Sequence, residues 1–103
     1  MIRVGDTFLE HYCGCSEAQG TRTQNGSQFS CTVAPQTHVI FMFDGSTLSH
    51  QIRSTGGTAF QSSHVVFSDA ETKQPHSVYF DQAGTYTFDD PYQPQLQGRI
   101  VVR

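Results

Sequence analysis

Short runs in which apolar and polar residues alternate recur along the whole chain, and they predict β-strands. The run 85–88 alternates threonines with aromatic residues, which is typical of a strand with one buried face. The run 99–102 is rich in β-branched residues that favour an extended backbone. No stretch shows a sustained helical period. The predicted strands cover residues 2–4, 7–13, 29–33, 38–44, 48–54, 63–67, 76–80, 85–88 and 99–102, the first two counted as one bulged strand.

The most apolar strand, residues 38–44, indicates which side chains fill the core. Val39, Phe41 and Phe43 share one face of that strand, because side chains alternate between the two faces of a sheet. By the same alternation we expect Phe80 and Phe88 to be buried. With about eight short strands at this spacing, the pattern predicts an all-β sandwich.

Ile40 and Met42 must then lie on the outer face of the same strand, where a sheet exposed to water usually carries polar residues. We therefore predict that they contact a protein partner or a second copy of the chain. A competing explanation is that the segment 1–28 folds over this face and covers both side chains. Within that segment, residues 16–28 are polar and contain turn-forming residues, which predicts a long loop excursion.

Length and composition limit the classes of function. With 103 residues the chain is expected to form a single domain over 1–103. The formal charge is -3, and only six lysines and arginines are spread along the chain. This balance argues against nucleic-acid binding, which needs a concentrated basic surface, and against an anionic membrane surface. No 18-residue apolar run predicts a transmembrane helix.

The first residues carry no secretory pattern, since Ile2 and Val4 already read as strand residues. This favours a protein made and used without export, in the cytoplasm or in a virion, over a periplasmic or secreted mature form.

The C-terminal segment 81–103 resembles the end of the cupredoxins, the plastocyanin and amicyanin family. In that family a segment of the form Ala-Gly-Thr-Tyr-aromatic-x-Cys-x-Pro-His, a loop, and Met-x-Gly-x-Val-x-Val carries three copper ligands. The residues that match the scaffold of this motif are Ala83, Gly84, Thr85, Tyr86, Pro91, Gly98, Ile100 and Val102. The resemblance extends from about Val33 to Arg103, and it implies a Greek-key β-sandwich of cupredoxin type.

The copper ligands themselves are mostly missing. By this resemblance His50 takes the position of the first ligand, Asp89 stands where the cysteine belongs, Tyr92 where the second histidine belongs, and Leu96 where the methionine belongs. A blue-copper centre needs a thiolate, two imidazoles and a weak axial thioether. We therefore predict a vestigial site without a cofactor. A weaker Cu(II) or Zn(II) site built from His50 and Asp89 is the alternative.

Three cysteines, Cys13, Cys15 and Cys31, surround the polar segment. A disulfide from Cys31 to either Cys13 or Cys15 would close that segment, and one thiol would be left over. The alternatives are a soft-metal site of Cys13 and Cys15 with His11 or His38, or three free thiols.

No pattern in the chain predicts catalysis. The acidic pair Asp89 and Asp90 lies in a predicted loop, where neighbouring carboxylates rarely acquire the separated pKa values that acid–base chemistry needs. We therefore expect a non-enzymatic binding or assembly module on a copper-free cupredoxin-like fold, such as a structural or capsid decoration protein. The alternative is a metal-binding or electron-transfer protein with a rebuilt site.

Overall fold

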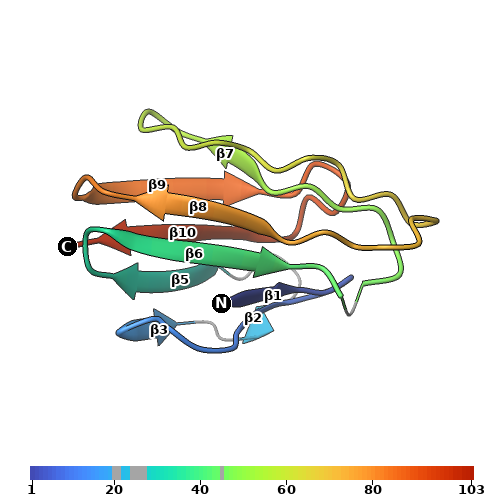
Figure 1. Cartoon of the computed structure of the whole chain (residues 1–103), viewed down its shortest axis with the longest axis horizontal. Coiled ribbons are helices and arrows are strands. Elements are labelled where there is room, and N and C mark those ends of the chain that lie inside the picture. The colour runs from blue at the N-terminus through green and yellow to red at the C-terminus, as the bar shows by residue number, and fades with distance from the viewer. Residues whose placement is uncertain (20–21, 24–27, 45) are drawn as a thin grey trace.

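The computed structural model describes residues 1–19, 22–23, 28–44 and 46–103. Their strands form two five-stranded sheets packed face to face as a β-sandwich (Figure 1). The first sheet has the order β4 (Arg22–Thr23), β2 (Leu9–His11), β1 (Ile2–Val4), β6 (Thr37–Met42) and β8 (His76–Phe80). The second has the order β3 (Glu17–Gln19), β5 (Gln28–Val33), β10 (Gln97–Val102), β9 (Gly84–Asp89) and β7 (Arg53–Thr55).

Two pairs of strands that are not consecutive in the sequence are parallel, β1 with β6 and β5 with β10. The remaining strand pairs are antiparallel. Strand β6 lies between β8 and β1 in its sheet (Figure 1). The predicted all-β sandwich is confirmed, with ten strands in the described residues instead of about eight. In this part of the chain the structure contains no helix long and apolar enough to cross a membrane.

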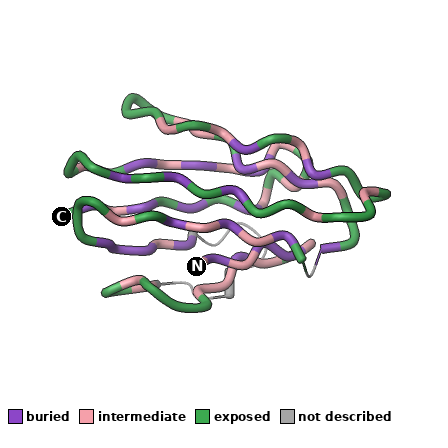
Figure 2. The backbone as a smooth tube through the Cα atoms, viewed as in Figure 1, coloured by how far each residue is buried: buried purple, intermediate pink, exposed green. Residues whose placement is uncertain are grey.

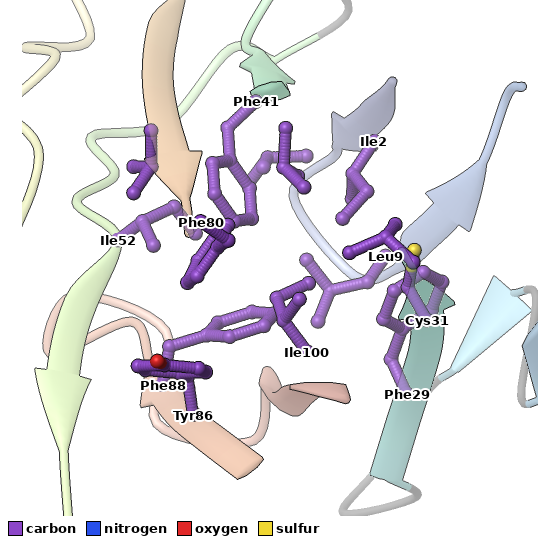
Figure 3. Packing of buried hydrophobic residues seen from close by; sticks show 14 of the residues in the cluster. Ile2, Leu9, Phe29, Cys31, Phe41, Ile52, Phe80, Tyr86, Phe88 and Ile100 are labelled. Carbon is purple, nitrogen blue, oxygen red and sulfur yellow. The ribbon is translucent and has the colours of Figure 1, made fainter. Parts of the chain in front are cut away.

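Alternating side chains of both sheets fill the core. Along β8 and β10 buried and more exposed residues alternate one by one (Figure 2), which is the pattern of strands with one face in the core. Phe41, Phe80 and Phe88 are buried as predicted, and Figure 3 shows them projecting into the space between the sheets. The rings of Phe41 and Phe88 meet edge to face, with their centroids 5.3 Å apart.

Gly98 explains one match to the C-terminal motif. It faces Phe88 across the β9–β10 ladder, and a Cβ at this position would lie 2.6 Å from the Phe88 ring and 3.1 Å from the Phe29 carbonyl. A larger residue would push an aromatic ring out of the core, so this position requires glycine.

Three predictions about the loops and strands are wrong. The segment 16–28, expected to be a loop, contains β3, β4 and the first residue of β5, although residues 20–21 and 24–27 lie outside the described part. Of the strand expected at 48–54 only residues from Arg53 onward form one, and the strand expected at 63–67 is reduced to a single bridge between Val66 and His50. Ser63 and Val66, three residues apart, are both buried whereas Phe67 is 57% exposed, because side chains outside a regular ladder do not follow the strict alternation.

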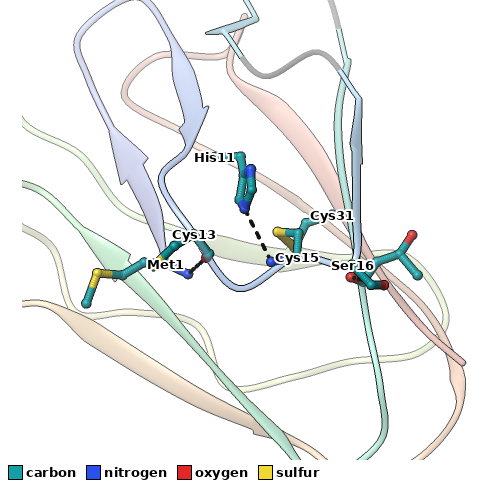
Figure 4. The surroundings of a disulfide bond; sticks show 7 residues. Met1, His11, Cys13, Cys15, Ser16 and Cys31 are labelled. Atoms are coloured by element: carbon teal, nitrogen blue, oxygen red, sulfur yellow. Dashed lines mark hydrogen bonds between the residues drawn. A yellow bond between two sulfur atoms is a disulfide. The ribbon is translucent and has the colours of Figure 1, made fainter.

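A disulfide joins Cys15 to Cys31, with 5.4 Å between the Cα atoms, and Cys13 remains an exposed free thiol. This selects one of the two predicted pairings. Figure 4 shows the bond beside the His11 ring, whose Nε2 accepts a hydrogen bond from the Cys15 amide at 3.3 Å. Since Cys15 is oxidised, the alternative of a Cys13–Cys15 soft-metal site is absent from this state.

We expect Phe41→Ala or Phe88→Ala to lower the free energy of unfolding by about 3–5 kcal/mol, because each leaves a cavity in the packed core. Urea unfolding followed by circular dichroism measures the loss. The matched control is Phe67→Ala, which removes an exposed ring and should change stability by less than about 0.5 kcal/mol. Equal losses at Phe41 and Phe67 would contradict the assigned core.

Replacing Cys15 and Cys31 together by alanine should lower the free energy of unfolding by about 3 kcal/mol, because a closed loop of this length restricts the unfolded chain. Cys13→Ser is the control and should leave stability unchanged. In denaturant the oxidised wild type should release one titratable thiol per chain. Three thiols in protein prepared without reductant would remove the disulfide from this description.

Candidate functional site

His50 is an ionisable side chain near the C-terminal loop that is buried with no exposed surface. Its backbone is held by a two-way bridge to Val66, from the His50 amide to the Val66 carbonyl at 2.9 Å and from the Val66 amide to the His50 carbonyl at 2.8 Å. This bridge fixes a connection that otherwise has no strand partner, and so it sets the direction in which the imidazole projects.

Both ring nitrogens of His50 face carboxylates. Nδ1 lies 2.6 Å from Oδ2 of Asp90, and Nε2 lies 2.8 Å from Oδ1 of Asp6. An imidazole that donates from both nitrogens is the charged imidazolium. The three side chains therefore form a charged triad, Asp6–His50–Asp90, that joins the β1–β2 turn, the β6–β7 connection and the loop after β9.

The pKa of His50 reflects these contacts. Burial alone lowers the pKa, but the hydrogen bonds to Asp90 and Asp6, together with the charges of both carboxylates, outweigh burial and raise the pKa above its ordinary value of 6.5. His50 is therefore held in its protonated form by the two carboxylates.

Asp6 has further donors that stabilise its ionised form. The Thr47 hydroxyl and amide and the Leu48 amide, the last at 2.9 Å, all donate to its carboxylate. Partial burial raises the pKa of Asp6. The bonds from Thr47, from His50 and from the Leu48 amide outweigh that burial, and the pKa lies well below the ordinary value of 3.8.

Asp90 is fully buried and its second oxygen is also bonded. Oδ1 accepts from the amides of Gln51 at 3.2 Å and Tyr92 at 3.0 Å. The Asp90 amide in turn donates to the Leu96 carbonyl at 3.1 Å. A buried carboxylate with this many donors can remain charged in the interior. The triad is thus a closed polar network in which each carboxylate accepts bonds from several donors of the β6–β7 connection, and Asp90 also accepts from its own loop.

Several solved structures share this fold. A purple cupredoxin from Nitrosopumilus maritimus superposes with a TM-score of 0.61 at 18% sequence identity, over 79% of this chain and 87% of that one. The fold is a cupredoxin fold. A Cu(I) form of an amicyanin variant gives a TM-score of 0.58 at 20% identity, over 72% of this chain and 69% of that one. A copper-containing nitrite reductase from Thermus scotoductus gives 0.60 at 15% identity, over 74% of this chain and 20% of that one.

At such identities the likeness to cupredoxins concerns the fold alone. No known protein-family profile matches the chain, and no curated protein matches it in sequence.

The structure shifts the acidic position of the cupredoxin motif by one residue. Asp89, predicted to stand at the cysteine position, points away from His50 and forms a two-point ion pair with Arg53, at 2.9 Å to Nε and 2.7 Å to Nη2. The carboxylate beside His50 belongs to Asp90 instead. Counted from Ala83, the motif puts its cysteine at residue 89 and its proline at residue 91, but the structure brings the next carboxylate, Asp90, to His50.

The structure also shows where the other predicted site residues, Leu96 and Tyr92, lie. Leu96 is buried next to the loop that carries Asp90, whereas Tyr92 is 46% exposed. Counting three residues on from Asp90, as the motif requires, puts Gln93 at the position of the second histidine. Asp6 was missed, because it belongs to an N-terminal segment without any resemblance to the motif; the Gly5-Asp6 turn gave the only signal.

This donor set does not fit a blue-copper centre. Asp6 and Asp90 lie against opposite nitrogens of one ring, so the three side chains cannot converge on one ion. Among the described residues no three histidine, cysteine or acidic side chains are grouped as metal ligands. A thiolate is also missing, because carboxylate oxygen replaces the soft sulfur that holds copper in such centres.

Stability should depend on pH through the triad. The raised pKa of His50 means that its contribution is complete below about pH 6.5 and is lost as pH rises through the pKa of the folded state. The lowered pKa of Asp6 means that its contribution is present above about pH 3.8 and is lost as pH falls through the folded-state pKa. Urea unfolding between pH 3 and pH 10 should therefore give a maximum between these limits and a decline on the alkaline side.

Asp6→Asn should flatten the alkaline decline, because it removes one of the two charges that raise the pKa of His50. His38→Gln, at an exposed histidine whose ring packs tilted against Tyr79, is the control and should leave the profile unchanged. A wild-type profile that rises steadily from pH 6 to pH 9 would contradict a charged His50.

Proposed function

We propose that this chain is a non-enzymatic binding and assembly module in which the charged triad Asp6–His50–Asp90 takes the place of the cupredoxin metal centre. The observation that carries the proposal is that both nitrogens of the buried His50 ring are bonded to carboxylates. A metal ligand must offer a free nitrogen lone pair, and in this arrangement both nitrogens donate instead. The triad serves to hold loops together, as a bound metal would.

The triad supports this role physically because its members are distant in sequence. Asp6 and Asp90 are separated from His50 by 44 and 40 residues, so each bond closes a long stretch of chain. Removing one partner leaves a buried charge without compensation, which costs about 3–5 kcal/mol in comparable networks. Such a network rigidifies one end of the sandwich and leaves its outer faces for contacts.

A rebuilt metal site is the second candidate, because an imidazole flanked by carboxylates contains ligand types that Zn(II) and Cu(II) accept. For that function His50 would have to lose a proton and one carboxylate would have to turn away. Metal binding would then compete with protons and would appear only as pH rises.

Two further aspects of the proposal concern where the module acts. The Cys15–Cys31 disulfide favours an oxidising compartment or an extracellular particle surface over a reducing cytosol. A role as a structural component of a larger particle, such as a capsid decoration protein, stays a prediction based on the size and fold of the chain.

Metal binding and site reconstruction test this function. Wild-type protein with Cu(II) should show no intense thiolate-to-copper absorption and, at pH 8 as at pH 6, no stoichiometric Cu(II) or Zn(II) binding by calorimetry. The triple variant Asp90→Cys, Gln93→His, Leu96→Met should gain the intense visible band, because it places a thiolate against Nδ1 of His50 and supplies the remaining ligands.

The matched control carries the same changes in the register predicted from sequence, Asp89→Cys, Tyr92→His, Leu96→Met. It should remain colourless, since residue 89 points to Arg53 on the outer side. Stoichiometric binding of Cu(II) or Zn(II) to the wild type that is abolished by Asp90→Asn would favour the rebuilt metal site and defeat the proposal.

A further inference from the structure

An apolar groove lies on the outer face of the sheet that contains β6. The groove has a volume of about 320 Å³ and is lined by Met1, Ile40, Met42, Phe43, Asp44, Lys73 and Pro75. Ile40 and Met42 are half-buried and lie on the opposite side of β6 from the buried Val39 and Phe41. Both predicted interface residues therefore lie in one hollow, and the N-terminal segment contributes to its lining without closing it.

Two opposite charges line the same groove. Asp44 has a side chain that is 62% exposed, and its contact to Arg3 is long, 3.9 Å from Oδ1 to Nε. Lys73 donates from Nζ to the carbonyls of Phe67 at 3.0 Å and Ser68 at 3.2 Å. Among the described residues Lys73 has no carboxylate partner. The groove thus combines an apolar surface, to which Ile40 and Met42 contribute, with an acid, Asp44, and a base, Lys73, that are not paired with each other.

We infer that the groove is the contact between two copies of this chain related by a two-fold axis, with Asp44 of each copy facing Lys73 of the other. This inference rests on the proposed assembly function and names the partner. A two-fold contact uses the same patch twice, so the patch must be complementary to itself. A groove with both signs of charge around an apolar surface meets that requirement, whereas a foreign acidic or basic partner would favour a groove of one sign.

The two parts of the groove have different roles in such a dimer. Burial of Ile40 and Met42 supplies most of the affinity, because apolar area is removed from water. The two Asp44–Lys73 pairs lie at the exposed rim and set the relative orientation of the copies. Since rim charges are screened by salt, dimerisation should weaken with ionic strength but persist in part.

The first test measures association by analytical ultracentrifugation of the oxidised full chain over a wide concentration range. Wild type should dimerise reversibly. Ile40→Thr with Met42→Gln should weaken dimerisation at least ten-fold while the melting temperature of the monomer stays the same. The matched control, Tyr92→Gln with Val101→Thr, removes apolar surface elsewhere and should leave dimerisation unchanged. A melting temperature of the first variant well below that of the wild type would assign the two residues to the core and overturn the inference.

The second test uses charge reversal and does not depend on the apolar surface. Asp44→Lys alone and Lys73→Asp alone should each dimerise several-fold more weakly than wild type, because like charges then meet at both rims. An equimolar mixture of these two variants should form heterodimers with the wild-type affinity, since both rim pairs become attractive again. Only a contact between residue 44 of one copy and residue 73 of the other predicts this rescue.

Covalent capture distinguishes failure of this inference from failure of the proposed function. Lys73 is the single lysine of the chain, so a carbodiimide should link Asp44 of one copy to Lys73 of the other, and mass spectrometry identifies the joined peptides. A wild type that is monomeric at all concentrations, or a mixture without rescue, overturns the two-fold contact. If that monomer still shows no metal binding, the binding-module function stands with a different partner.

Discussion

A buried imidazolium between two carboxylates is the constraint on which one end of this molecule depends. Transferring three charged groups from water is costly, so the network of Asp6, His50 and Asp90 adds little net stability compared with an apolar core. It nevertheless makes every alternative arrangement of the three loops expensive, because a displaced partner leaves a buried charge behind. The triad therefore determines which conformation these loops adopt more than how stable the sandwich is.

The rest of the fold is arranged so that these loops reach the same place. Parallel pairing of β1 with β6 positions the turn that carries Asp6, and the bridge to Val66 holds His50. The antiparallel β9–β10 pair encloses the loop with Asp90, which the buried Leu96 secures. The Cys15–Cys31 disulfide attaches the connection between β2 and β3 to β5, and so links the N-terminal strands to the second sheet.

The charged triad and the apolar groove on the outer face of β6 are separate features of the structure. The polar groups of the triad are satisfied internally, whereas the outer face of β6 keeps apolar side chains in an open groove. A fold by itself does not decide function. In this chain Asp6, His50 and Asp90 are bonded to one another and join three loops, while the groove on the outer face of β6 keeps apolar side chains together with one acid and one base that are not paired with each other.

The sequence by itself determined the all-β class, the single sandwich and the core rings of Phe41, Phe80 and Phe88, because strand alternation is a local property that a regular ladder preserves. It also located His50 and Leu96 through a motif. Only the tertiary structure decided that Asp90 and Asp6, and not Asp89, contact the His50 ring. It also decided that Cys15, and not Cys13, bonds to Cys31. Asp6, His50 and Asp90 lie in connections without regular pairing, where a shift of one residue changes the direction of a side chain, and the two partners of His50 come from about 40 residues away. No local pattern encodes such contacts, since they arise only when the packed sheets bring the loops together.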